Sequence, residues 1–202
     1  MVNISVYLNE INKPMPAISK REQIISTALI LFYQHGFHAT GIDKIIKQAG
    51  VSKKTLYNHF ESKDELILET LKRRDEVFTN KMIAETERLA KSPKTRLLSI
   101  FDAHDLWFNE KTFSGCMFIN ASAEFASHND PFHLICAKHK RNIKEYLYEL
   151  AKQAHAQDAE LLSQQLSLLL EGAIVDAYVS GNTKAAITAK SIAQVIIKQA
   201  IE

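Results

Sequence analysis

A short polar run from Ser52 to Phe60, reading Ser-Lys-Lys-Thr-Leu-Tyr-Asn-His-Phe, contains the side chains best suited to recognition chemistry. Lysines neutralise phosphate, and threonine, tyrosine, asparagine and histidine side chains hydrogen-bond to base edges or phosphate oxygens. Leu56 and Phe60 are four residues apart, so on a helix they share one inward face. The side chains left to face outward are Lys53, Lys54, Thr55, Tyr57, Asn58 and His59. This division predicts a surface that binds nucleic acid.

The residues before this run predict a sharp turn between two helices. Ala49 is small enough to let the helices approach, Gly50 permits a positive φ, and Val51 fills the space between them. Ser52 is a good N-cap, and Val51 and Leu56 occupy the two positions of a hydrophobic staple. We therefore predict a helix-turn-helix from Thr40 to His59, whose second helix directs its N-terminus at phosphate.

Two other helix starts flank this motif. Thr40 has the chemistry of an N-cap for the helix before the turn, and Asp43 stands where an acidic side chain can complete the cap. Lys63 follows Ser62, which opens the capping box Ser62-Lys63-Asp64-Glu65 at the start of a long apolar-periodic segment that extends to about Lys91. We expect Thr40 and Lys63 to contact the DNA backbone beside the recognition helix.

Apolar periodicity predicts helices along the rest of the chain, and only six glycines and four prolines interrupt it. The first spans Lys20 to His35, with Ser19 as N-cap and Gly36 after its end. The later ones span about 94–110, 116–127, a long helix opening at Asp130, 158–180 and 184–201. The expected fold is all-α, with an N-terminal arm (1–18), a helix-turn-helix domain (19–65) and a helical ligand-binding and dimerisation domain (66–202).

Composition and charge limit the classes of protein and of binding partner that the rest of the sequence allows. The net charge of +2 in 202 residues is too small to identify a nucleic-acid partner by itself. Cys116 and Cys136 match no zinc or haem spacing, and the histidines are scattered, so we expect reduced thiols and neither a metal nor a cofactor. The first 18 residues lack a signal-peptide pattern, and the apolar stretch 161–179 contains Gln, Glu and Asp, which argues against a membrane span. A cytoplasmic location is expected.

About a quarter of the chain, from Arg21 to about Leu71, resembles the N-terminal domain of tetracycline-repressor (TetR) type regulators. The motifs that carry the resemblance are Gly36-Phe37, Thr40, Ala49-Gly50-Val51-Ser52, Thr55-Leu56-Tyr57-Asn58-His59-Phe60 and Ser62-Lys63-Asp64-Glu65-Leu66. The resemblance implies that DNA is contacted by Thr40, Lys53, Thr55, Tyr57, His59 and Lys63, with Lys63 on phosphate. For Lys54, contact with phosphate and contact with a base are both open. The resemblance also implies a larger C-terminal domain that dimerises and binds an inducer.

The last two predicted helices, 158–180 and 184–201, are more apolar than one buried face requires. Pairing with the same helices of a second copy in a four-helix bundle would bury the excess, although a purely internal core is the alternative. A two-fold homodimer would place two recognition helices on a palindromic operator.

A mixed set of aromatic and polar residues in the middle helices suits a small-molecule pocket, although each could equally be ordinary core. These candidates are Trp107, Phe108, Phe113, Cys116, Met117, Asn120 and Glu124. Cys116 follows Gly115 at a predicted helix N-terminus, where the helix dipole favours a reactive thiolate, so a thiol that senses electrophiles or oxidants is a second hypothesis. A buried, inert small side chain is the alternative.

These inferences lead to a DNA-binding transcriptional regulator, expected to be a repressor that an inducer releases from operator DNA. The alternatives are regulation through the Cys116 thiol, a helical thiol enzyme, and a helical adaptor that binds another protein. An enzyme is not expected, because the chain has no recognisable triad or oxyanion pattern and because that activity would leave residues 40–60 unexplained.

Overall fold

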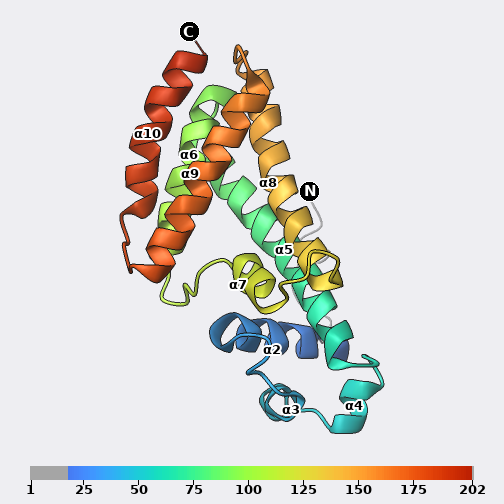
Figure 1. Ribbon diagram of the computed structural model, residues 1–202. Coiled ribbons are helices and arrows are strands. Elements are labelled where there is room, and N and C mark those ends of the chain that lie inside the picture. Colours follow the sequence, from blue (N-terminus) through green and yellow to red (C-terminus); the bar gives the residue numbers. More distant parts are fainter. Residues whose placement is uncertain (1–17, 202) are drawn as a thin grey trace, which may run out of the picture.

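The computed structural model describes residues 18–201, which form an all-helical structure (Figure 1). The helices, labelled as in the figure, are α2 (Lys20–His35), α3 (Ile42–Ala49), α4 (Lys53–Tyr57), α5 (Lys63–Leu89), α6 (Pro93–Phe108), α7 (Met117–Glu124), α8 (Pro131–Gln153), α9 (Ala159–Val179) and α10 (Ala185–Ala200). No residue in 18–201 is in a β-strand. The prediction of an all-α fold is therefore confirmed, with helix ends displaced by at most one turn. Of the predicted arm, residues 1–17 lie outside the described part of the chain.

Helices α2, α3 and α4 form a small head at the bottom of Figure 1. Ser19 caps α2 as predicted, because its Oγ accepts a hydrogen bond from the Glu22 backbone N–H at 3.1 Å. The Gln23 amide donates to the Ala49 carbonyl at 2.8 Å and so ties α2 to the end of α3. The head has its own buried side chains, including Ile24, Ala28, Phe32, Ile45 and Leu56. Burial of these side chains fixes the turn that precedes α4.

The prediction that Thr40 caps the second helix is wrong. The N-cap of α3 is Gly41, which makes no side-chain capping bond, and Asp43 is exposed rather than part of a cap. Thr40 is fully buried, and its Oγ1 donates to the Leu31 carbonyl at 3.4 Å. Packing of the chain against α2 turns the hydroxyl inward, so in this conformation the Thr40 side chain is not available to DNA.

Helix α5 joins the head to the rest of the molecule. Ser62 caps it by accepting a hydrogen bond from the Glu65 N–H at 3.1 Å, as the sequence predicts. The helix then runs for 27 residues without interruption. The expected domain boundary between residues 65 and 66 therefore falls within a continuous helix, which can transmit displacement between the two parts.

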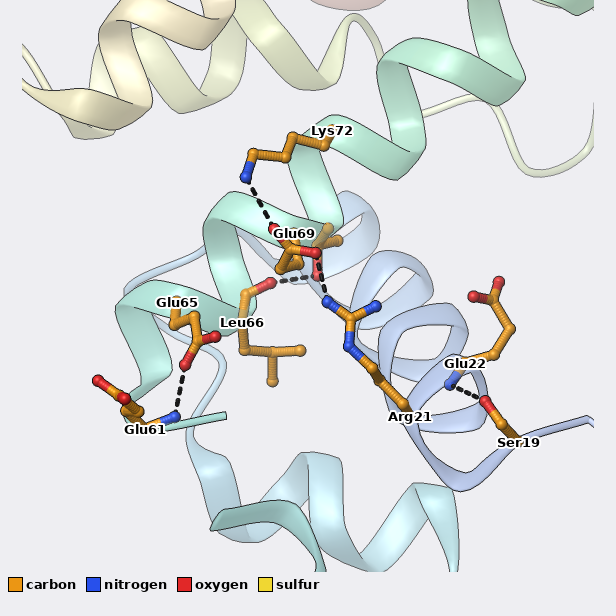
Figure 2. A network of polar contacts seen from close by, with 9 residues as sticks. Ser19, Arg21, Glu22, Glu61, Glu65, Leu66, Glu69 and Lys72 are labelled. Atoms are coloured by element: carbon orange, nitrogen blue, oxygen red, sulfur yellow. Dashed lines mark hydrogen bonds and ion pairs between the residues drawn. The ribbon is translucent and has the colours of Figure 1, made fainter. Parts of the chain in front are cut away.

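Two ion pairs fasten α2 to α5. Arg21 of α2 reaches Glu69 of α5, which also accepts a hydrogen bond from Lys72 (Figure 2). One turn further along α5, Arg73 pairs with Glu22 at 3.1 Å. The Arg21 guanidinium also lies 5.3 Å from the centre of the Phe60 ring, just beyond the end of α4. These contacts hold the head at one orientation relative to the start of α5.

Helices α6 to α10 form the body around the remainder of α5. Helices α9 and α10 run side by side along one edge, and the short helix α7 lies at the end of the body that faces α2 (Figure 1). Lys190 of α10 pairs with Asp102 of α6 at 2.7 Å. Within residues 18–201, no helix is both long enough and apolar enough to span a membrane.

The core of the body contains two histidines. His104 is buried against Trp107 and Phe108, and its Nδ1 lies 2.7 Å from the Ile100 carbonyl oxygen. His139 stacks on the Phe118 ring with centroids 3.8 Å apart. Burial disfavours the charged imidazolium and lowers the pKa of each histidine to about 4, in His139 despite the opposing hydrogen bond to Asp75. The folded core therefore contains neutral imidazoles.

Acidification should destabilise the fold between pH 6.5 and 4. The folded-state pKa of His104 is lower than its ordinary value of 6.5, so the unfolded chain binds more protons in this window and the free energy of unfolding falls as the pH falls. We expect the His104→Leu variant to lose up to ~3 kcal/mol of this pH dependence. Denaturant unfolding at several pH values, at one protein concentration, measures it. The exposed His35→Gln variant is the control, and equal pH dependence in wild type and His104→Leu would contradict the assignment.

Candidate nucleic-acid interface

Helix α4 is short and fixed at both ends. The Ser52 Oγ accepts a hydrogen bond from the Thr55 N–H at 3.0 Å and lies 2.8 Å from the Thr55 hydroxyl oxygen. Gly50, before the cap, has φ +61°, a left-handed conformation that glycine adopts without strain. Leu56 and Phe60 are buried as predicted. These contacts leave one side of the helix free.

The predicted outward side chains lie together on this free side. Lys53, Lys54, Tyr57, Asn58 and His59 are exposed, and Thr55 is half-buried through its bond to Ser52. Lys53 Nζ is 3.9 Å from Asp43 at the start of α3, an exposed and therefore weak pair. The surface thus offers two ammonium groups and several hydrogen-bonding side chains around one helix N-terminus, a combination suited to phosphate and base edges.

Lys63 occupies a different environment from the lysines of α4. Its ammonium group donates a hydrogen bond to the Phe37 carbonyl at 2.7 Å, across the loop between α2 and α3. Lys63 is half-buried and holds this loop in position. One feature that sequence reasoning missed lies nearby: Gly41 leaves the first N–H groups of α3 without a side-chain cap. A helix N-terminus without a side-chain cap can bind a phosphate through its free N–H groups. The glycine before Ile42 is the feature of the sequence that could have predicted it.

Glu124 lies at the junction between head and body. Its carboxylate accepts hydrogen bonds from the backbone N–H groups of Phe37, at 2.9 and 3.1 Å, and His38, at 2.7 Å, and it also contacts His38 Nδ1 at 2.8 Å. Burial opposes ionisation, but the bonds from His38 and Phe37 outweigh it and lower the pKa of Glu124. Gly36, with φ +83°, leaves room for the carboxylate, because a Cβ at this position would lie only 2.8 Å from Glu124 Oε1. We call this set of contacts the Glu124 clamp.

A second contact links the head to the segment before α7. The Tyr33 hydroxyl accepts a hydrogen bond from the Ser114 N–H at 3.0 Å and donates one to the Gly115 carbonyl at 2.9 Å. Gly115, with φ +76°, packs so closely on the Tyr178 ring of α9 that a Cβ would lie 2.7 Å away. Head, segment 114–116 and α9 are therefore in continuous contact.

The structure brings three of the predicted ligand-binding residues together, since the rings of Trp107, Phe108 and Phe113 pack on one another with centroids 5.1 to 5.5 Å apart. Trp107, Phe108, Cys116 and Met117 are buried in the body core, and Phe113 packs at its margin. The half-buried Asn120 donates to the Ser114 carbonyl at 3.3 Å, and Glu124 forms the clamp. Glu124 does not line either of the two cavities that Trp107 borders, and its carboxylate is bonded to two backbone N–H groups. The ligand-binding role of all these residues stays a prediction.

Trp107 and Cys116 border a buried cavity of about 10 Å³, which is space for about one water molecule. Lys140 enters this cavity from α8, donating to Glu171 at 2.6 and 2.8 Å and lying 3.5 Å from the Cys116 sulfur. Cys116 is the N-cap residue of α7, at the helix N-terminus as predicted, but it is buried. Thiol sensing therefore also stays a prediction.

A capped helix-turn-helix head on a helical body defines the class of helix-turn-helix DNA-binding regulators. Comparison with known protein families supports the same class. Residues 24–70 match the model of bacterial regulatory proteins of the tetR family, and residues 93–193 match that of the tetracyclin repressor-like C-terminal domain. The chain belongs to the TetR family of transcriptional regulators, and the function is DNA-binding regulation rather than enzyme catalysis.

Individual relatives agree with the assignment. The HTH-type transcriptional activator FasR of Mycolicibacterium smegmatis is 46% identical over 59 residues, a match that covers 29% of this chain and 27% of FasR. The HTH-type transcriptional repressor ComR of Escherichia coli is 26% identical over 172 residues, covering 80% of this chain and 81% of ComR. A TetR-family transcriptional regulator from Streptomyces coelicolor superposes with a TM-score of 0.83 at 25% identity, over 91% of this chain and 96% of that one.

Removing the charge of the Glu124 clamp should loosen the loop of the head. In the Glu124→Gln variant the amide retains one acceptor oxygen but loses the charge-assisted bonds to Phe37 and His38. We expect the amide hydrogens of these two residues to exchange at least about tenfold faster, since such bonds contribute ~1.5–3 kcal/mol when fully formed. Hydrogen exchange of the full chain measures this, with Glu149→Gln on the exposed face of α8 as control. Unchanged protection at Phe37 and His38 would show that the clamp contributes nothing.

Proposed function

We propose that this protein binds a palindromic operator as a homodimer and represses transcription until a small-molecule inducer releases it. The observation that carries the proposal is the capped helix α4, with Lys53, Lys54, Tyr57, Asn58 and His59 exposed on its free side. The family includes a repressor and an activator among the relatives above, so the direction of regulation belongs to the proposal. A cytoplasmic location follows from the same role.

We propose that α4 lies in the major groove. Lys53 and Lys54, at its N-terminus, neutralise phosphates, while Tyr57, Asn58 and His59 reach base edges. Thr55 is half-buried, and its hydroxyl lies 2.8 Å from the Ser52 oxygen. We therefore propose that Thr55 contacts DNA only from the edge of the exposed surface. Beside it, the uncapped N–H groups of α3 face the DNA backbone. Lys63 acts mainly by holding the Phe37 carbonyl, with phosphate as a second partner.

Dimerisation is proposed through α9 and α10. These helices leave eight large apolar side chains exposed: Leu161, Leu168, Val175, Tyr178, Val179, Ile187, Ile192 and Val195. A groove of about 220 Å³ runs between the two helices, lined in part by Leu168, Gly172 and Ile192. Water contact with so much apolar surface is unfavourable, and a second copy of the same helix pair would cover it.

We propose domain limits close to 19–65 for DNA binding and 66–202 for ligand binding and dimerisation, joined within α5. Inducer binding in the body would release DNA by shifting the Glu124 clamp and the Tyr33 contact, which connect the head to α7 and the segment before it. Coupling of this kind is typically worth about 1–3 kcal/mol.

The first test concerns the recognition helix. Fragments of the source genome enriched by the purified full chain should share one inverted repeat, and the affinity for that duplex should fall steeply as salt rises. Because the proposed homodimer presents two copies of each lysine, we expect the slope of log affinity against log salt to decrease by about 4 in the Lys53→Ala, Lys54→Ala double variant. The matched control is Lys94→Ala on α6. No enrichment of any fragment, or an unchanged salt slope, would contradict the proposed interface.

The second test concerns the dimer. A glutamate in place of Leu168, which is 75% exposed in the single chain, would be buried without a partner in the proposed interface. Sedimentation velocity should therefore show wild type as a dimer and Leu168→Glu shifted to monomer, with operator affinity reduced in parallel. Leu134→Glu, at an exposed leucine of α8, is the control. A wild-type monomer, or an unaffected dimer in Leu168→Glu, would be the contrary result.

A further inference from the structure

A pocket of about 270 Å³ lies outside the core of the body, where the head meets α5 and α6. Its size is near the lower end of the ~300–1,000 Å³ typical of small-molecule sites. Helix α2 contributes Ile30 and Tyr33, α5 contributes Arg74, Phe78 and Lys81, and the end of α6 contributes Trp107. The pocket therefore touches both parts of the molecule.

Arg74 is the distinctive residue of this pocket. Its guanidinium carbon is 4.6 Å from the centre of the Tyr33 ring and 4.8 Å from that of Phe78, so the planar group is held by two aromatic side chains. Among residues 18–201 it forms no ion pair with a carboxylate, whereas Arg21, Arg73, Arg88 and Arg96 each do. A half-buried guanidinium with several free N–H donors is arranged to accept an anion.

The other residues of the pocket indicate the charge and the polarity of the anion that would fit it. Lys81 pairs with Glu110, so these two charges cancel and Arg74 leaves a net charge of +1. The walls are otherwise largely apolar, and Ile30 and Val77 are 54% and 46% exposed, open to cover by a ligand. An inorganic anion would leave those surfaces in water, whereas an apolar body that bears one negative charge would bury them.

We propose that this pocket binds a small organic carboxylate, with the carboxylate on the Arg74 guanidinium and the apolar body between Ile30, Val77 and Trp107. The guanidinium fork matches the two oxygens of a carboxylate. Because Tyr33 also holds Ser114 and Gly115, a ligand in this pocket contacts the residue that connects α2 to the segment before α7. The site is distinct from the buried cavity beside Cys116 and Lys140.

The single tryptophan of the chain, Trp107, lines this pocket and reports its occupancy. Full-length protein without DNA is titrated separately with benzoate, hexanoate, benzamide and inorganic phosphate while tryptophan fluorescence is recorded. Benzoate or hexanoate should give a saturable change, and benzamide and phosphate should not.

Three variants locate the site. Arg74→Met keeps the length and apolar stem of the side chain but removes its charge, and we expect it to weaken carboxylate binding at least about tenfold. Arg88→Met, also on α5 but outside the pocket, should bind as wild type, as should Lys140→Met, which alters the buried cavity next to the same tryptophan. Near-ultraviolet circular dichroism checks that each variant keeps the native packing.

The proposal is overturned if neither carboxylate binds, if benzamide or phosphate binds as well as the carboxylates, or if Arg74→Met binds with wild-type affinity. Loss of binding in Lys140→Met alone would assign the signal to the buried cavity and overturn it too. Because the titration contains no DNA, its outcome is independent of the proposed operator recognition.

Discussion

One carboxylate of the body holds the loop of the DNA-binding head that precedes the recognition motif. Glu124, at the end of α7, accepts the backbone N–H groups of Phe37 and His38, which follow α2 and would otherwise be unpaired. Gly36, with φ +83°, precedes these two groups, and its missing side chain makes room for the carboxylate. Lys63 holds the Phe37 carbonyl from the other side. The loop that precedes the recognition motif is thus held by one residue from the body and one from α5.

The rings around the clamp explain why the loop is well packed. Phe37 stacks on Phe32 of α2 with centroids 5.0 Å apart and meets the edge of Phe125 at 5.8 Å. His38 lies over the same Phe125 ring at 5.0 Å. Movement of α7 in the body would therefore displace both the hydrogen bonds and the aromatic contacts of the head. This arrangement links the body physically to the helix-turn-helix head without a flexible hinge.

The core of the body and the junction pocket differ in what they can accommodate. In the core, His104 and His139 are neutral, Lys140 is paired with Glu171, and the space beside Cys116 is about that of one water. A ligand could bind there only by displacing packed side chains, so its binding would favour a changed conformation of the body. The pocket beside Arg74 is already open and retains an unpaired cation. The two cavities therefore differ in size and in the charge that they present.

The sequence by itself determined what depends on neighbours a few residues away. The caps at Ser19, Ser52 and Ser62, the left-handed turn at Gly50 and the inward face of Leu56 and Phe60 all follow from helix period and local hydrogen bonds, and each was predicted. Only the tertiary structure decided the burial of Thr40, the use of Lys63 on a carbonyl and the role of Glu124. Glu124 and Phe37 are separated by 87 residues, and no local pattern specifies which backbone N–H groups a distant carboxylate will meet. Their pairing is set by how α7 packs on α8 and how α8 packs on α5, a property of the assembled core.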